Sequence, residues 1–303
     1  MNVLVVDGGG TKTQAWLVSA EMRTCLTTVR AGPSSPSAVS PEGVAATFAE
    51  LAANLAPNAL PKQVVLGLAG AGRKPEQLVA LAAGRRVFTE AEIHVLTDAE
   101  LAYRGVFRKG QPGILLIVGT GAIALYRTPI SKEFSRAGGW GPLLGDEGGG
   151  AWFGREALRH CLLEWERDEL GPLHTAILEA LEIEEASQIL TRVYKDKFGP
   201  RDWARLAPIV FNHTRDDPGA LKILKNAAIE LVALVEHLQE TLAPDAQTLP
   251  LGVVGGIWNH RHHLQPLMEE EIRMRNLPVV FIEPVGGCLE GGLNYLQDIG
   301  RLK

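Results

Sequence analysis

Short apolar runs alternate with helical patterns along the first third of the chain. Residues 3–6 form a continuous apolar run and residues 13–18 alternate, so both are expected to be strands. Residues 44–55 carry apolar side chains at three- and four-residue intervals, which is typical of an amphipathic helix. Two further apolar runs, 63–68 and 93–96, are each followed by another helical pattern. This alternation predicts an α/β fold.

The rest of the chain is richer in helical patterns. Apolar residues recur at helical spacing over 151–169, 173–181, 185–196 and 220–242. Further strands are predicted at 114–118, 122–126, 249–254 and 279–282. Turn chemistry around Pro112 predicts a boundary there, between an N-terminal lobe of residues 1–112 and a C-terminal lobe of residues 113–303. The final helix, about residues 286–299, is a candidate for packing back on the N-terminal lobe.

Two segments about one domain apart resemble each other. Residues 3–11 and residues 115–121 are both apolar strands that open into a turn of Gly and Thr. Such a turn lets backbone N–H groups approach an anion because no Cβ stands in the way, and the Thr hydroxyl adds a donor. Either turn alone is also compatible with a simple tight hairpin. The pair favours two related lobes that cradle a polyphosphate, in a setting unlike that of P-loop or Rossmann proteins.

Two aspartates follow predicted strands. Asp7 stands beside the first turn, where its carboxylate is suited to hold Mg²⁺ through water. Asp98 falls where a strand gives way to a helix, a position suited to a general base towards an attacking hydroxyl. Both have ordinary alternatives, since Asp7 also suits a turn, and either Thr97 or Asp98 suits the helix N-cap.

The most unusual segment is residues 138–150, in which seven of thirteen residues are glycine. A loop of this kind costs backbone entropy on folding, which favours a functional role over a purely structural one. Trp140 and Asp146 lie within it. A flat indole with carboxylates suits a sugar, which offers an apolar ring face and hydroxyl hydrogens.

Composition narrows the class of protein further. The chain has 303 residues, with 30 Lys and Arg against 35 Asp and Glu, and a formal net charge of −5. It has no basic domain, so we expect no nucleic-acid partner. Its three cysteines, Cys25, Cys161 and Cys288, form no CxxC pair and suit a reducing cytoplasm. Without a basic leader or an apolar stretch of about 18 residues, neither secretion nor membrane insertion is expected.

Together these residues resemble the N-acetylglucosamine kinase family, a group of BadF/BadG/BcrA/BcrD-type ATPases within the actin/hexokinase-like superfamily. The resemblance implies a two-lobed fold of duplicated ribonuclease H-like domains with an inter-lobe cleft, ATP and Mg²⁺ as cofactors, and a homodimer. It implies that Asp98 is the general base towards a sugar 6-hydroxyl and that Asp7 is the metal residue. The implied ATP-binding residues are Gly9, Gly10, Thr11, Lys12, Gly119, Thr120, Gly121, Gly255 and Gly256. The implied sugar-binding residues are Ser35, Asp98, Gly139, Trp140 and Asp146.

The sequence departs from the family pattern at three positions. Ser35 stands where an Asn that contacts the sugar is usual, and Ala122 and Gly149 stand where Ser is common. A serine at position 35 lacks the donor and acceptor of an amide. The acceptor therefore stays open between N-acetylglucosamine, glucosamine, glucose and another hexose.

Three functions are compared. The first is an ATP-dependent amino-sugar or hexose kinase. The second is a dehydratase-activating ATPase, which needs clustered thiolates for an iron–sulfur cluster that the three separated cysteines do not supply. The third is a sugar-sensing relative without catalysis, which the retained Asp7, Asp98 and phosphate turns disfavour.

Overall fold

The fold is that of a computed structural model, which describes residues 1–303 apart from 22–23, 56–59, 128–132, 197, 243–247 and 303. The chain forms two compact units. Unit 1 contains Met1–Gln111 together with Pro284–Lys303, and unit 2 contains Pro112–Glu283. The last twenty residues thus belong to unit 1, whereas the predicted boundary at 112/113 places them in the C-terminal lobe. Within the described residues, no helix is long and apolar enough to cross a membrane.

Unit 1 is built on a five-stranded sheet with the order β3-β2-β1-β4-β5. Its strands are β1 (Asn2–Gly8), β2 (Thr13–Ser19), β3 (Thr24–Ala31), β4 (Gln63–Leu68) and β5 (Glu92–Leu96). The first three are antiparallel neighbours, whereas β1, β4 and β5 are parallel. The carboxyl ends of β1, β4 and β5 therefore lie at one edge of the sheet.

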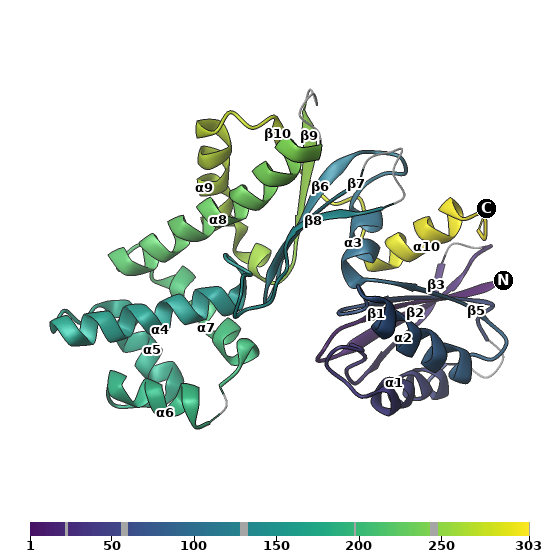
Figure 1. Cartoon of the computed structure of the whole chain (residues 1–303), viewed down its shortest axis with the longest axis horizontal. Helices are drawn as coiled ribbons and strands as arrows, with labels where there is room; N and C mark the ends of the chain where they lie inside the picture. The colour runs from purple at the N-terminus through teal and green to yellow at the C-terminus, as the bar shows by residue number, and fades with distance from the viewer. Residues whose placement is uncertain (22–23, 56–59, 128–132, 197, 243–247, 303) are drawn as a thin grey trace. The chain divides into compact units, whose positions relative to one another are not determined.

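Helices cover both faces of this sheet (Figure 1). They are α1 (Pro41–Ala53), α2 (Lys74–Val87), α3 (Asp98–Val106) and α10 (Cys288–Asp298). Alternate residues of β1 divide between two cores, because successive side chains of a strand point to opposite faces. Leu4 and Val6 pack with α1 and α2, whereas Val3 and Val5 pack with α3 and α10.

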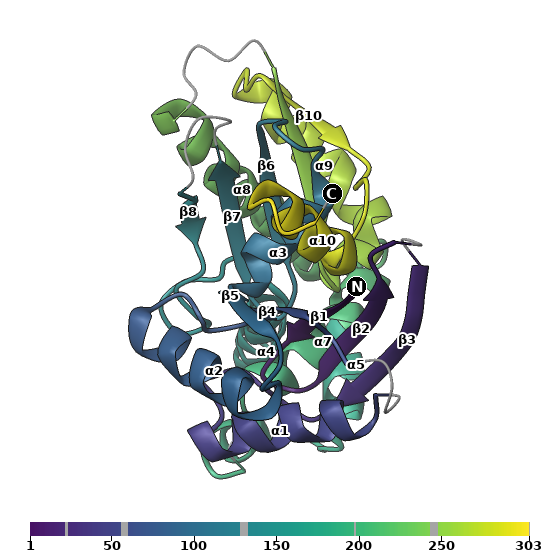
Figure 2. The same cartoon turned by 90° about the vertical axis from the view of Figure 1, so that its right-hand side faces the viewer.

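The helices α3 and α10 lie side by side (Figure 2). Glycines permit this approach. A Cβ added to Gly105 of α3 would meet the backbone oxygen of Gly287, and one added to Gly291 of α10 would meet the backbone oxygen of Leu101. The close crossing brings the first residue of α10 to the sheet edge where β1 and β5 end, as the electrostatic contacts of Cys288 with Asp7 and Asp98 show.

Unit 2 repeats the topology of unit 1. Its strands are β6 (Gly113–Val118), β7 (Ala122–Arg127), β8 (Ser135–Gly138), β9 (Leu249–Val254) and β10 (Val279–Ile282). They have the order β10-β9-β6-β7-β8, with β6 antiparallel to β7 and parallel to β9. Strands β6 to β10 therefore correspond one by one to β1 to β5. The prediction of a duplicated α/β fold is confirmed.

The larger helical part of unit 2 follows β8 and precedes β9. Its helices are α4 (Gly150–Arg167), α5 (Pro172–Leu181), α6 (Ile189–Tyr194), α7 (Pro200–Asn212) and α8 (Pro218–Leu242), and α9 (Arg261–Met274) follows later. Short 3-10 segments occupy Ala186–Gln188 and Ile257–His260. The segment 185–196, predicted from its helical spacing, contains a 3-10 turn followed directly by the short α6. One continuous core joins the sheet to these helices.

Candidate active site

The first glycine turn connects β1 to β2 and is fixed by the loop that follows β3. The Gly9 N–H donates to the Lys12 carbonyl (3.0 Å), and the Gly9 carbonyl accepts from the N–H groups of Ser34 and Ser35 (3.1 and 3.2 Å). Thr11 and Lys12 are exposed. The turn is therefore held by backbone bonds while the Thr11 hydroxyl stays accessible for a ligand.

The loop at residues 32–36 packs beneath this turn. The Thr13 hydroxyl lies 2.7 Å from both the Gly32 carbonyl and the Ser34 hydroxyl, and Ser34 is fully buried. Ser35, predicted to contact a sugar, is 3% exposed, and its hydroxyl lies 3.1 Å from that of Ser37. A contact between Ser35 and a sugar stays a prediction.

Asp98 is the first residue of α3, directly after β5. The helix is capped by Thr97, whose hydroxyl accepts from the Glu100 N–H (3.0 Å), while the Glu100 carboxylate accepts from the Thr97 N–H (3.0 Å). Of the two alternatives for the N-cap, Thr97 is correct. The Asp98 carboxylate is not the N-cap, but it accepts from the N–H of Ala99 in the first turn (2.9 Å).

The environment of Asp98 disfavours its charged form. Burial raises the pKa of Asp98 to about 6, and the negative charge of Asp7 contributes to the rise. A carboxyl with this pKa is ionised at pH 7 yet basic enough to accept a proton from a hydroxyl. Because Thr97 caps the helix, the burial and raised pKa of Asp98 favour a chemical role for its carboxyl.

Asp7 has an unexpected neighbour in Cys288. The Cys288 side chain hydrogen-bonds with the Asp7 carboxylate, and burial followed by the charge of Asp7 raises the pKa of the thiol, which therefore stays protonated and acts as the donor. Burial also raises the pKa of Asp7, against the opposing effects of this hydrogen bond and of the Lys12 charge. Sequence reasoning missed Cys288, since no motif joins residues 281 positions apart.

Asp7 and Asp98 together offer what a hydrated Mg²⁺ requires. Both carboxylates belong to the carboxyl edge of the sheet in unit 1. The negative charge of Asp7 raises the pKa of Asp98, so the two carboxylates repel each other when both are ionised. A cation of charge +2 would relieve this repulsion, and hard oxygen ligands are those that Mg²⁺ prefers. The residues present therefore fit a magnesium ion.

The second glycine turn, Gly119-Thr120-Gly121, joins β6 to β7 at the matching position in unit 2. The Gly119 N–H donates to the Gly121 carbonyl (2.9 Å), and Thr120 is exposed. The N–H groups of Gly150 and Ala151 donate to the carbonyls of Gly119 and Thr120 (2.8 and 2.9 Å). The amino end of α4 thus holds the second turn in place.

Asp146 lies under that turn. It is 8% exposed, has a positive φ of 62°, and accepts a hydrogen bond from the Gly141 N–H (3.1 Å). A Cβ on Gly121 would clash with its carboxylate, and burial raises the Asp146 pKa. The carboxylate therefore connects the glycine-rich loop to the second turn.

A Cβ on Gly149 would also lie 2.7 Å from the Gly121 Cα, which explains a glycine where the family pattern has serine.

Trp140 occupies the exposed part of the glycine-rich loop. It is 65% exposed, and the Arg136 guanidinium lies 4.1 Å from the centre of its ring. Arg136 also donates to the carbonyls of Gly138 and Gly139 (2.8 and 3.2 Å). Arg136 holds the indole by a cation–π contact, in an orientation that leaves it available to a ligand.

Gly255 and Gly256 follow β9, next to the end of β6. Gly255 has a φ of 113°, and a Cβ there would meet the Val118 carbonyl oxygen, so only glycine fits. A Cβ on Gly256 would meet nothing within 4 Å, which shows open space beside it. The second turn, the glycine-rich loop and the predicted adenosine motif therefore belong to one region of unit 2.

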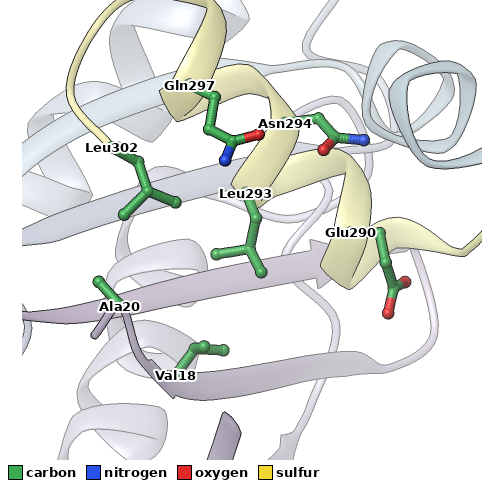
Figure 3. A pocket seen from close by; sticks show the side chains of 7 residues that line it. All are labelled: Val18, Ala20, Glu290, Leu293, Asn294, Gln297 and Leu302. Atoms are coloured by element: carbon green, nitrogen blue, oxygen red, sulfur yellow. The ribbon is translucent and has the colours of Figure 1, made fainter. Parts of the chain in front are cut away.

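A separate pocket of about 110 Å³ lies between β2 and α10 in unit 1 (Figure 3). Val18 and Ala20 line its floor, and Leu293 points towards them from α10 (Figure 3). None of the residues that line it is among the predicted site residues. This pocket is therefore not the predicted site.

The duplicated sheets with a Gly/Thr turn after each central strand define an actin/hexokinase-like, two-domain ATPase fold. The chain belongs to the BadF/BadG/BcrA/BcrD ATPase family, whose model matches residues 4–288.

Named relatives span nearly the whole chain. It is 29% identical over 269 residues to the N-acetylmuramic acid/N-acetylglucosamine kinase of Clostridium acetobutylicum, covering 86% of this chain and 87% of that protein. It is 28% identical over 295 residues to the N-acetyl-D-glucosamine kinase of Dictyostelium discoideum, covering 90% of each. A crystal structure from Chromobacterium violaceum, provisionally named N-acetylglucosamine kinase, is 27% identical, covers 96% of this chain and 97% of that one, and superposes with a TM-score of 0.76.

Proposed function

We propose that the protein is an ATP-dependent sugar kinase that phosphorylates the 6-hydroxyl of N-acetylglucosamine, glucosamine or a related hexose. The observation that carries the proposal is Asp98, a buried carboxyl with a pKa of about 6 that is not the N-cap of its helix and lies beside a metal-suited carboxylate. Two relatives that cover most of the chain are named as kinases of N-acetylated sugars, which supports this reaction class.

In the proposed reaction Asp98 accepts the proton of the sugar hydroxyl as its oxygen attacks the terminal phosphorus of ATP. Phosphoryl transfer needs mainly alignment and neutralisation of charge. Mg²⁺ held through Asp7 would supply part of that neutralisation. Backbone N–H groups of the two turns and the hydroxyls of Thr11 and Thr120 would bind the phosphates, and Lys12 would add a positive charge beside the first turn.

Gly9, Gly10, Gly119 and Gly121 would let the phosphates approach the backbone, and Gly255 with Gly256 would border the adenine. Trp140 and Gly139 would contact the sugar, with the indole against its apolar ring face. Asp146 would act on the sugar chiefly by fixing the loop, because its carboxylate is buried beneath Gly121.

Ser35 leaves the 2-substituent of the sugar with a weaker partner than an amide would be. Its hydroxyl already pairs with that of Ser37. A site without a dedicated polar partner discriminates weakly against an analogue that lacks the matching group. We therefore propose modest selectivity between N-acetylglucosamine and glucosamine or glucose.

A cytoplasmic homodimer completes the proposal, on the strength of the family resemblance alone.

The activator-type ATPase is the less favoured function. Its iron–sulfur cluster needs thiolates that meet in glycine-rich loops. Here Cys25 lies on β3, Cys161 is buried within α4, and Cys288 hydrogen-bonds Asp7. These three positions belong to different elements, and the protonated thiol of Cys288 is unsuited to ligate iron.

A coupled assay of ADP release tests the proposal. The full-length protein is assayed with Mg·ATP and a panel of N-acetylglucosamine, N-acetylmuramic acid, glucosamine, N-acetylmannosamine and glucose, and the product is located by NMR. We expect sugar-dependent ADP release and phosphate at O6. ADP release that no sugar stimulates would overturn the kinase proposal and favour the activator-type ATPase.

A further inference from the structure

Four ionisable side chains of unit 2, which lie on or beside α4, α5 and α8, gather in one cluster. His160 and Glu164 lie one turn apart on α4, His174 lies in the first turn of α5, and Asp217 directly precedes α8. Within the described residues, His160, Glu164 and Asp217 are the one group of three whose candidate ligand atoms all lie within 4.8 Å of one another.

The distances within this group are those between ligands of one small cation. His160 Nε2 lies 3.1 Å from Glu164 Oε1 and 3.7 Å from Asp217 Oδ1. Ligand atoms about 2.1 Å from a tetrahedral zinc lie about 3.4 Å from one another, by simple geometry. The distance between His160 Nε2 and Glu164 Oε1 is close to that value, and a carboxylate oxygen of Asp217 lies within 4.8 Å of both.

One ring nitrogen of each of the two histidines forms no hydrogen bond. His160 Nε2 and His174 Nδ1 are both buried without a hydrogen-bond partner, and His174 is only 2% exposed. His174 Nδ1 lies 3.8 Å from Glu164 Oε2, too far for a hydrogen bond but directed at the cluster. A buried polar atom without a partner is rare in a folded protein, and each such case calls for an explanation.

The negative charges of Glu164 and Asp217 also favour a bound cation. Asp217 has a side chain that is 1% exposed and Glu164 one that is 15% exposed. In the described part of the chain, the ion pairs of these two carboxylates involve only His160 and His174. With neutral imidazoles the cluster therefore carries a charge of about −2, and buried charge of this kind requires compensation. A divalent cation cancels it.

The surrounding backbone holds the acidic ligands in place. Asp217 Oδ1 accepts from the N–H groups of Gly219 and Ala220 (2.8 and 3.0 Å), and Oδ2 accepts from that of Leu173 (2.9 Å), which leaves one acceptor position, on Oδ2. Gly219 has no Cβ, and one added there would collide with the His160 ring. Outer contacts that orient carboxylates and exclude larger side chains are a regular feature of metal centres.

We propose that His160 Nε2, Glu164 and Asp217 bind a zinc-class divalent cation, beside the buried ring of His174. Mixed imidazole and carboxylate ligands favour Zn²⁺ or Co²⁺ over Mg²⁺, which prefers oxygen alone. His160 stands ten residues from Gly150, or about 15 Å along α4 at 1.5 Å per residue. The site is therefore separate from the second phosphate turn, and it links α4 to the residue that precedes α8 without taking part in phosphoryl transfer.

Metal content and thermal stability test this inference independently of kinase activity. The full-length protein is dialysed against EDTA, refilled with ZnCl₂ or CoCl₂, desalted and measured by elemental analysis and Co²⁺ visible absorption. We expect about one metal per chain with the absorption of tetrahedral cobalt. At a free Zn²⁺ concentration a hundredfold above the Kd, Tm should rise by roughly 5–10 °C, from ligand linkage in a domain of this size.

Two variants locate the site. His160→Gln removes a ligand and should lose the bound metal and the Zn²⁺-dependent rise in Tm, while its Tm in EDTA reports whether the fold is intact. Glu164→Gln should behave likewise. The matched control is His213→Gln, since His213 pairs with Asp216 (3.2 Å) but belongs to no three-ligand group among the described residues. It should keep both the metal and the shift.

Two results would overturn the inference. Equal metal binding by the wild type and His160→Gln would place the metal elsewhere, for example at the histidines of residues 260–263. A wild type that binds no stoichiometric metal after refilling with ZnCl₂ or CoCl₂ would show that the cluster is held by its own hydrogen bonds and ion pairs instead.

Discussion

Replacement of Asp98 by asparagine should have opposite effects on catalysis and on stability. The pKa of the Asp98 carboxyl rises from 3.8 to about 6 in the folded protein. Folding therefore binds protons between these pH values, and stability falls as the pH rises through that window. A difference of about two pKa units corresponds to about 3 kcal/mol, by which the ionised carboxylate lowers the free energy of unfolding at pH 8. Asparagine keeps the shape and removes this cost.

A smaller term opposes that gain. Asp98 is the first residue of α3, and a negative charge at a helix amino end contributes up to about 1 kcal/mol. Asp98→Asn should therefore stabilise the protein by about 2 kcal/mol at pH 8, or roughly 4–8 °C in the Tm of the transition that unfolds unit 1. The difference should shrink as the pH falls from 8 to 4, because the wild-type carboxyl then becomes neutral.

Catalysis should respond in the other direction. Without a group that accepts the hydroxyl proton, kcat should fall by roughly 10²–10⁴. In the wild type, kcat/KM should rise about tenfold per pH unit below pH 6 and level off above it, and the variant should lose this dependence. Glu42→Gln is the matched control, since it removes an exposed acid from the first turn of α1 and should change neither kcat nor its pH dependence.

Calorimetry across pH 4–8 and the coupled ADP assay on the same preparations measure both effects. A variant with turnover within threefold of the wild type would refute the role of Asp98 as base. A variant that is destabilised at pH 8 would refute the argument from burial, even with activity lost.

Three further outcomes are expected. Thr120→Val should weaken ATP binding by about 1–2 kcal/mol in calorimetry through one lost hydroxyl contact, and unchanged affinity would contradict the phosphate role of the turn. Cys288→Ala should raise KM for Mg·ATP by about 2- to 12-fold with the sugar KM unchanged, because Asp7 loses a donor, whereas Cys288→Ser should behave as wild type. Ser35→Asn should raise the ratio of kcat/KM for N-acetylglucosamine over glucosamine from a wild-type value on the order of 10² or less, and a wild-type ratio far above this would contradict the argument.

The parts of the site that the sequence predicted are those with local signals. Both glycine turns follow the central strands of their sheets, and Asp98 lies at the junction of β5 and α3. These features depend on strand periodicity and turn chemistry within about ten residues, which a sequence displays directly.

The rest depends on contacts between distant residues. Nothing near Cys288 indicates that it meets Asp7, because the meeting requires α10 to rejoin unit 1 after the whole of unit 2. The burial of Asp146 beneath Gly121 likewise depends on how the glycine-rich loop folds back. The group around His160 unites three helices, so its members appear in the sequence as ordinary polar positions.

The return of α10 has a consequence for synthesis of the protein on the ribosome. One face of the first sheet, with Val3, Val5 and Val65, is packed against α3 and α10 together. Between α3 and α10 the whole of unit 2, Pro112–Glu283, must be translated. At about 5–20 residues per second this takes roughly 10–35 s, during which the nascent sheet lacks half of its cover on that face. The core between this face of the sheet and the two helices is therefore completed only after α10 has been synthesised.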